Sequence, residues 1–483
     1  MFHAASATIT YGPGIGQVTI DVLPDGALLE IFDFYKDDLI NRTVQFLTWR
    51  WIGMTQVCRR WRNIIFGSPR RLDLRLICTN ETPARTSLGI WPPFPLVVYC
   101  ENMPSAVDEK GLSNVIAALK HSDRISRVHI HNTKGPALEK IVAIMGEPFP
   151  TLKVCQISSV DDSVPVFPET FSAGSAPHLK SLGLSGIPFS TSRKFVLSII
   201  HVELLHLLNI PNSGYITPET MVAFLAALPN LKHLSIGFRS PPPRPTIQTN
   251  RPPLRRVILP ALTVLHFSGV SEYFEDIVAR IDTPLLDWLR IAFFLDLIFH
   301  IPQLHDFINR TKSPGPRNQA FIVFSNTVIK IMLGSPNRFD LEVKCERLDW
   351  QLSSISQIFS EQLTFLSHVE QLELRESFFP QLKKVKPDPD MDSSLWLELF
   401  RLFTALQSIY VCELLVPPVA AALQELSEGG TMELLPALQS LSLEGLQPDG
   451  PEQKAIQSFV DSRRPSDHPV VIQNWDGYWQ LPA

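Results

Sequence analysis

The segment LPALQSLSLEGL, from Leu435 to Leu446, carries the pattern on which most of the chain is built. Within it, Leu438, Leu441 and Leu443 are spaced by three and then two residues, and Pro436 precedes them by two. The last two leucines alternate with polar residues, which is the period of a short strand with one buried face. A proline at this distance is typical of a turn that leads into such a strand. The segment therefore predicts a turn followed by a half-buried strand.

The same apolar-x-x-apolar-x-apolar pattern recurs along the chain. Ten copies begin at Ile125, Leu152, Leu179, Val202, Leu231, Leu262, Leu286, Val369, Leu406 and Leu438. Stretches with helical spacing lie between them, at 107–120, 137–145, 218–228, 271–281, 353–363, 395–403 and 415–426. A strand followed by a helix at intervals of about 20–29 residues is typical of leucine-rich repeats. One unit cannot bury its apolar face alone, so the units are expected to stack into a curved solenoid with a parallel sheet.

The repeats are irregular, because most lack the Asn that usually follows the strand and the intervals are uneven. Between Ile291 and Val369 the pattern blurs. Strands are predicted there at 321–324, 328–333 and 341–344. Because their starts are close together, some of these strands are expected to be joined by a turn without a helix. Polar or proline-rich loops are expected at 240–256, 311–318 and 381–394. An α/β domain with unrelated crossovers is the alternative interpretation.

A second organising stretch lies near the N-terminus. A helix is predicted over 23–34, since Leu28, Ile31 and Phe32 share one face and Asp25 suits the N-cap. A second helix is predicted over roughly 51–65, with apolar residues on one side and arginines largely on the other. Two short amphipathic helices cannot bury much of their own surface, so this piece is expected to complete its core against a partner or the next domain.

The order of residues in this stretch resembles the F-box. The pattern consists of Leu23-Pro24, then Leu28-Leu29 and Ile31-Phe32, and finally VCRRWR at Val57 to Arg62. The resemblance covers about a tenth of the chain, and the connection from Tyr35 to Arg50 is longer and more polar than usual. A helical hairpin packed on its own domain is the alternative. With the loosely spaced repeats and the Leu435–Leu446 run, the chain resembles a large group of fungal F-box-like proteins.

The resemblance implies an α/β chain in which a short N-terminal helical F-box precedes an irregular leucine-rich-repeat-like solenoid, with parallel strands inside and helices outside. The expected divisions are a leader over 1–17, the F-box-like segment over 18–66, a linker with first strands and a helix over 67–120, the solenoid over 121–446 and a C-terminal cap over 447–483. A helix over 452–462 and a strand over 470–475 would form that cap.

The family role is to hold the Skp-type adaptor of a cullin–RING ubiquitin ligase, and through it the cullin scaffold. The resemblance implies adaptor contacts by Leu23, Pro24, Leu28, Leu29, Ile31, Phe32, Val57, Cys58 and Trp61, with Arg59 and Arg62 at the rim. Exposed strand residues would bind a protein substrate, and the candidates are His129, Lys180, His233 and Glu373. A separate subunit would supply the ubiquitin, so the chain itself is not expected to be an enzyme.

Two other classes of function stay open at this point. One is a repeat scaffold that binds a protein without meeting a ligase. The other is an enzyme in the irregular middle, from Phe299 to Cys345. The chain contains no H-E-x-x-H, G-x-S-x-G or Walker loop. His129 and His131 alternate along one strand without a nearby carboxylate or thiol, so no metal or other cofactor is expected.

The amino-acid composition limits which kinds of partner and which cellular compartment are expected. The net charge is −5, which disfavours a nucleic-acid partner bound through bulk positive charge. The six cysteines are scattered and form no C-x-x-C pair, which favours reduced thiols in an intracellular protein, cytoplasmic or nuclear. The N-terminus lacks the features of a signal peptide. The longest apolar stretch, Ile291 to Ile301, is too short to span a bilayer, so no membrane association is expected.

Overall fold

The computed structural model describes residues 20–37, 47–81, 88–101, 109–161, 164–174, 176–241, 255–294, 299–311, 318–334, 339–359, 366–377, 392–428, 434–447, 450–463 and 469–475. The predicted leader and all but the ends of the three predicted loops lie outside these residues. The chain forms two compact units, Met1–His129 and Ile130–Ala483. The division falls inside the strand formed by the first repeat copy.

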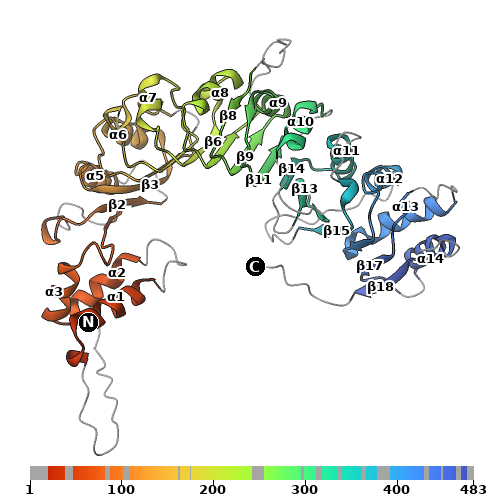
Figure 1. Cartoon of the computed structure of the whole chain (residues 1–483), viewed down its shortest axis with the longest axis horizontal. Helices are drawn as coiled ribbons and strands as arrows, with labels where there is room; N and C mark the ends of the chain where they lie inside the picture. Colours follow the sequence, from red (N-terminus) through yellow and green to blue (C-terminus); the bar gives the residue numbers. More distant parts are fainter. Residues whose placement is uncertain are drawn as a thin grey trace, which may run out of the picture. The chain divides into compact units, whose positions relative to one another are not determined.

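The first unit opens with a short 3₁₀ turn and three α-helices (Figure 1). They are η1 (Ile20–Val22), α1 (Asp25–Asp37), α2 (Leu47–Val57) and α3 (Arg59–Gly67). The prediction of a single helix over 51–65 is wrong, because the backbone is extended at Cys58. The Cys58 thiol accepts a hydrogen bond from the Trp61 amide at 3.4 Å and so caps α3. Cysteine is not a usual N-cap residue, and the break therefore left no clear mark in the sequence.

The three helices share one hydrophobic core. Leu28, Phe32 and Trp51 are buried there, and Trp51 meets Phe94 edge to face with ring centroids 5.5 Å apart. Leu72 and Leu74, which follow the helices, are buried in the same core together with Phe94. The helical segment therefore completes its core with residues from the predicted 67–120 linker.

The rest of the first unit begins the β/α pattern. Its elements are β1 (Leu76–Cys78), β2 (Leu96–Cys100), α5 (Glu109–Leu119) and the start of β3 (Ile125–Thr133). β1 and β2 pair in parallel, with Leu76 opposite Leu96. The first strands expected within 67–120 are therefore present, and β1 begins only at Leu76 because Leu72 and Leu74 pack on the helices instead.

The second unit contains a long sheet whose strands are mostly parallel. All ten copies of the repeat pattern form strands, the first of them β3 and the others β4 (Val154–Ser159), β5 (Ser181–Ser185), β6 (Leu204–Ile210), β7 (His233–Phe238), β9 (Val264–Gly269), β11 (Trp288–Phe293), β15 (Gln371–Glu376), β16 (Ser408–Val411) and β17 (Ser440–Glu444). The copies also stack in register, since Leu205 lies opposite Leu182 on one side and Leu234 on the other. Equivalent leucines thus form continuous buried rows.

Helices cover one side of these strands within the second unit (Figure 1). They are α6 (Gly135–Ile144), α7 (Arg193–Ser198), α8 (Pro218–Ala226), α9 (Ser271–Arg280), α10 (Pro302–Arg310), α11 (Leu348–Ile358), α12 (Ser394–Arg401), α13 (Val416–Glu428) and α14 (Pro451–Arg463). The helix predicted over 452–462 and the strand predicted over 470–475 are present as α14 and β18 (Val471–Trp475), and β18 pairs in parallel with β17. α7 and α10 were not predicted, since one has six residues and the other lies where the pattern blurs.

Smaller elements fill the connections. They are the 3₁₀ turns η3 (Phe171–Gly174), η4 (Asn212–Gly214), η5 (Leu366–His368) and η6 (Glu413–Leu415), and the two-stranded parallel sheet of β8 (Val257–Ile258) and β10 (Ile281–Asp282).

A three-stranded antiparallel insertion interrupts the parallel order. It consists of β12 (Gln319–Phe324), β13 (Val328–Leu333) and β14 (Phe339–Lys344). The spatial order is β11-β14-β13-β12-β15, and only the middle strand, β13, runs against its neighbours. This confirms the predicted returns without helices. The second unit is therefore a β/α solenoid with one inserted meander.

Candidate functional site

The strands of the second unit present two faces. One face is buried against the helices, and the other, here called the strand face, points away from them. In β6, for example, Leu205 and Leu207 are buried, whereas His206 is half-buried and Leu208 is exposed. The residues that lie two, four and six positions after the first residue of each repeat copy are on the strand face. We call them the second-, fourth- and sixth-position residues. Because copies stack in register, each of these positions forms a row across the sheet.

Four neighbouring strands bring together a row of imidazole and guanidinium groups. His206, Ser235, His266 and Arg290 are the fourth-position residues of β6, β7, β9 and β11, and they lie in register. His206 Nδ1 is 3.0 Å from Ser235 Oγ. Arg290 is exposed and has no ion-pair partner among the described residues. We call these four residues the His–Arg row.

The rows on either side of the His–Arg row differ in character. The second-position row holds His233 and Trp288. Trp288 is 40% exposed, and its ring lies edge-on to the His266 ring with the centroids 5.7 Å apart. The sixth-position row holds small residues on three adjacent strands, Gly237, Ser268 and Ala292. The His–Arg row is thus bordered by the Trp288 ring on one side and by three small residues on the other.

Electrostatics make this region weakly positive at neutral pH. Burial lowers the pKa of His266 to about 4, and the nearby Arg290, His206 and His233 lower it further in the same direction. Burial and the neighbouring His233 also lower the pKa of His206. Both imidazoles are therefore neutral at pH 7, and the fixed positive charge of the row is the Arg290 guanidinium.

A neighbouring cluster pairs one carboxylate with two ammonium groups and keeps a net charge of +1. Glu203 lies between Lys180 and Lys232, with N–O distances of 2.7 and 2.8 Å. Hydrogen bonds from these two ammonium groups lower the pKa of Glu203 to about 2. Lys180, one of the predicted substrate-binding residues, is therefore engaged in an exposed ion-paired cluster.

The four predicted substrate-binding residues do not form one site. His129 lies on β3 in the first unit, where its ring is 6.3 Å from that of Tyr99. His233 lies in the second-position row beside the His–Arg row, whereas Lys180 precedes β5 and lies one position outside the rows. Glu373 lies on β15, beyond the inserted meander, where it forms an ion pair with Arg375.

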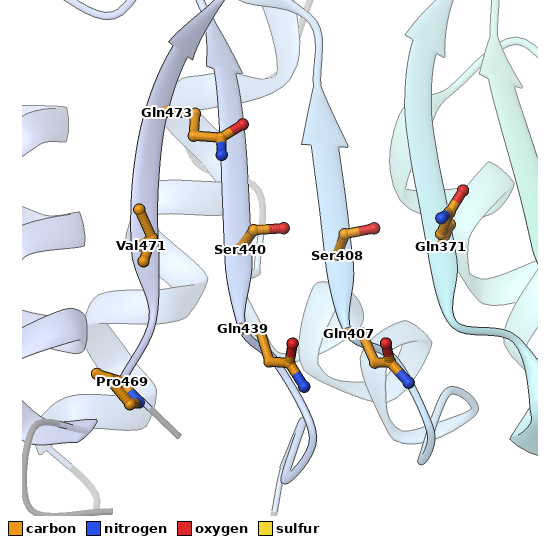
Figure 2. Close-up of a pocket in the computed structure, with 8 residues that line it drawn as sticks. All are labelled: Gln371, Gln407, Ser408, Gln439, Ser440, Pro469, Val471 and Gln473. Atoms are coloured by element: carbon orange, nitrogen blue, oxygen red, sulfur yellow. The ribbon is translucent and has the colours of Figure 1, made fainter. Parts of the chain in front are cut away.

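A shallow polar hollow of about 500 Å³ lies on β15 to β18 (Figure 2). Its lining consists of Gln371, Gln407, Ser408, Gln439, Ser440, Pro469, Val471 and Gln473. Amide and hydroxyl groups dominate this lining, and none of these residues carries a charge. Gln371 Oε1 accepts a hydrogen bond from Gln319 Nε2 at 2.8 Å, so the row of amides continues onto β12. Such a surface can exchange hydrogen bonds with uncharged polar groups such as peptide amides.

The helical segment places its predicted adaptor-binding residues in three environments. Leu28 and Phe32 are buried in the core of their own unit. Leu23, Leu29, Cys58 and Trp61 are half-buried, and the Trp61 ring packs on Phe32 at 4.8 Å. Pro24, Ile31, Val57, Arg59 and Arg62 are exposed, and Arg62 Nε also donates to the Thr55 carbonyl at 3.0 Å. Only part of the predicted set is therefore on the surface.

Exposed apolar side chains are concentrated on this helical segment. The described residues include fifteen exposed large hydrophobic side chains, and five of them lie between residues 20 and 57. These five are Ile20, Val22, Ile31, Phe34 and Val57, with exposures of 43 to 77%. Ile20, Val22 and Phe34 were not predicted as site residues, although each is apolar and lies off the buried face.

None of the four residues of the His–Arg row was predicted as a site residue. A comparison of the ten repeat copies at their second and fourth positions would have shown Trp288, His206, His266 and Arg290 in equivalent places.

Among the described residues, the structure contains no group of three metal-ligating side chains. No described helix combines the length and apolar character needed to cross a membrane.

Comparison with known proteins adds little to this picture. No protein-family model and no curated protein sequence matches the chain. A solved structure similar to the chain is that of the leucine-rich repeat-containing protein LegL7 from Legionella pneumophila. The two are 12% identical, the match covers 80% of this chain and 97% of that one, and the TM-score is 0.29. A likeness of this degree identifies neither a family nor a function.

Proposed function

We propose that this protein is the substrate-recognition subunit of an SCF-type cullin–RING ubiquitin ligase. In this proposal the helical segment docks on a Skp-type adaptor, and the strand face of the second unit binds a protein target. The observation that carries the proposal is a helical segment with F-box-like residue order that leaves five apolar side chains exposed. Exposed apolar patches on soluble proteins commonly mark interaction sites.

The proposed mechanism is proximity. A target held on the strand face would be kept at high effective concentration near a ubiquitin donor bound through the adaptor and the cullin. No reactive group on this chain is needed, and no cofactor is invoked. The role requires an intracellular location, either cytoplasmic or nuclear.

A repeat scaffold not coupled to ubiquitination is the second candidate. The observation that favours it is the burial of Leu28 and Phe32, together with the packing of Trp61 on Phe32. These side chains are used inside their own unit, in a core shared with Leu72 and Phe94. That arrangement is expected of helices that pack only on their own domain.

Co-purification of the full chain with a Skp-type adaptor distinguishes the two candidates. The informative variant combines Phe34→Asp with Val57→Asp, because both side chains are exposed and their replacement leaves the core intact. Leu197→Asp is the matched control, since Leu197 is 50% exposed on α7 in the second unit. We expect wild type and control to bind the adaptor and the double variant to lose it.

Two results would count against the ligase role. Folded wild type that does not bind the adaptor would favour the scaffold. Equal adaptor binding by the double variant would mean that the exposed apolar residues of the helical segment are not the docking surface. Leu28→Ala is unsuitable here, because removing a fully buried leucine costs about 2–5 kcal/mol and would impair folding.

A further inference from the structure

We infer that the His–Arg row, with His233 and Trp288, binds an acidic, carboxylate-rich segment of a protein partner. This inference deepens the proposed function, because it assigns a substrate class to the strand face on which that proposal rests. It is argued from charge complementarity, from the shape of the rows and from the reach of an extended chain.

Charge on this part of the strand face is of one sign. The second, fourth and sixth positions of β4, β5, β6, β7, β9 and β11 are all described, and none of them is Asp or Glu. They include one arginine and three histidines, namely Arg290, His206, His233 and His266. A partner segment with carboxylates would therefore meet the exposed Arg290 guanidinium, beside half-buried imidazoles and without an opposing carboxylate in these rows.

Acidic groups at the border of the region lie outside the three rows of these six strands. Glu342 on β14 is half-buried and lies opposite Ala292. Glu203 is held by Lys180 and Lys232. Asp340 lies in register with Arg290 on β14 but pairs with Lys330 at 3.2 Å. Asp287 lies one position before Trp288, outside the three rows. The Arg290 guanidinium is therefore the fixed positive charge within the three rows, and Lys180 and Lys232 add positive charge beside them.

The dimensions suit a short extended peptide. From β6 to β11 the row crosses three strand spacings of about 4.8 Å, or roughly 14 Å, which is the reach of about four extended residues. Ser268 and Ala292 are small and leave space for a peptide backbone beside the row on β9 and β11, whereas the Leu208 side chain of β6 lies beside Gly237. Trp288 offers an exposed ring for an apolar side chain that flanks the carboxylates.

A carboxylate is favoured over a phosphate by the amount of fixed charge. Phosphate groups carry about two negative charges near pH 7 and are usually held by clusters of arginine. This row has one arginine, and the His206 and His266 imidazoles are neutral at pH 7. The single guanidinium of the row can pair with one singly charged carboxylate of the segment.

The test is fluorescence anisotropy with the full chain, without adaptor, and a labelled peptide of sequence Gly-Ser-Glu-Glu-Glu-Glu-Ser-Gly. We expect saturable binding at pH 7 and low salt, and none by the peptide with Gln in place of Glu. Arg290→Glu and the milder Arg290→Gln should weaken binding about ten-fold or more. Arg193→Glu is the matched control, because Arg193 is exposed on α7 and the charge change is the same. Circular dichroism and thermal melting establish that each variant is folded.

Three results would overturn the inference. They are equal binding of the Gln peptide, an unchanged affinity of both folded Arg290 variants, and binding only when the peptide carries phosphoserine. Each leaves adaptor co-purification unaffected, so the ligase proposal would stand while the assigned target class falls. Loss of adaptor binding with retained peptide binding would have the opposite meaning.

Discussion

The side-chain amide of Gln351 on α11 donates to the carbonyl oxygen of Ser325, 2.7 Å away in the turn between β12 and β13. The same nitrogen donates to the Cys345 carbonyl at 3.0 Å, just after β14. Gln351 is fully buried. One side chain therefore joins the helix that follows the inserted meander to the first turn of that meander and to its C-terminal end.

Replacement of Gln351 by Leu should destabilise the second unit by about 1–3 kcal/mol, because two buried carbonyl groups lose their donor. Urea denaturation monitored by circular dichroism measures this change. Gln424→Leu is the matched control, since Gln424 is exposed on α13 and its loss should change stability by no more than about 0.5 kcal/mol. Equal stability of the two variants would show that the meander does not depend on this contact.

Glu275 of α9 caps the next helix. Its carboxylate accepts hydrogen bonds from the Gln303 and Leu304 amides at 2.8 and 2.7 Å, at the start of α10. Glu275→Ala should cost about 1–2 kcal/mol, because two N–H groups at the helix start lose their acceptor. Thermal melting at pH 8 measures the effect. Glu139→Ala, an exposed glutamate on α6, should melt like the wild type, and a similar loss in both variants would contradict the capping role.

The same carboxyl group should make stability depend on pH. Burial raises the pKa of Glu275 to about 7, although the two amide hydrogen bonds oppose this rise. In the unfolded chain the group would lose its proton near pH 4.5, so the folded state binds more protons between about pH 4.5 and 7. The contribution of Glu275 to stability should therefore decrease as the pH rises through that window. The unfolding free energy of wild type minus that of Glu275→Gln should decrease from pH 4.5 to 7, and a pH-independent difference would exclude this linkage.

Cysteine reactivity should separate the two kinds of thiol in the chain. Burial raises the pKa of Cys155 and Cys345 to about 12 and that of Cys78 and Cys412 to about 11, and Cys100 is buried as well. Only Cys58 is half-exposed. A maleimide at neutral pH should therefore label the native protein rapidly at one position and label all six thiols in denaturant.

The control for this labelling is Cys58→Ser, which keeps a side chain able to cap α3. Rapid labelling should disappear in that variant while its melting temperature stays close to that of the wild type. Continued fast labelling of folded Cys58→Ser would mean that a second thiol is accessible, contrary to the burial of the other five.

Much of the solenoid could be predicted because its determinants are local. The ten copies at Ile125 through Leu438 each show a strand period within six residues, and all ten form strands. The crowded starts at 321, 328 and 341 likewise indicated turns without helices. In contrast, the break at Cys58 depends on a thiol accepting from an amide three residues away, which apolar spacing does not indicate.

The sequence by itself determined which residues form strands and which side of each strand is buried, since both follow from apolar spacing over a few residues. Only the tertiary structure decided which strands are neighbours. The reversal to β14-β13-β12 and the contacts of Gln351 and Glu275 join residues that are far apart in the chain. The His–Arg row exists for the same reason. His206, Ser235, His266 and Arg290 are spread over three repeat intervals, and stacking of the repeats in register brings their side chains onto one face.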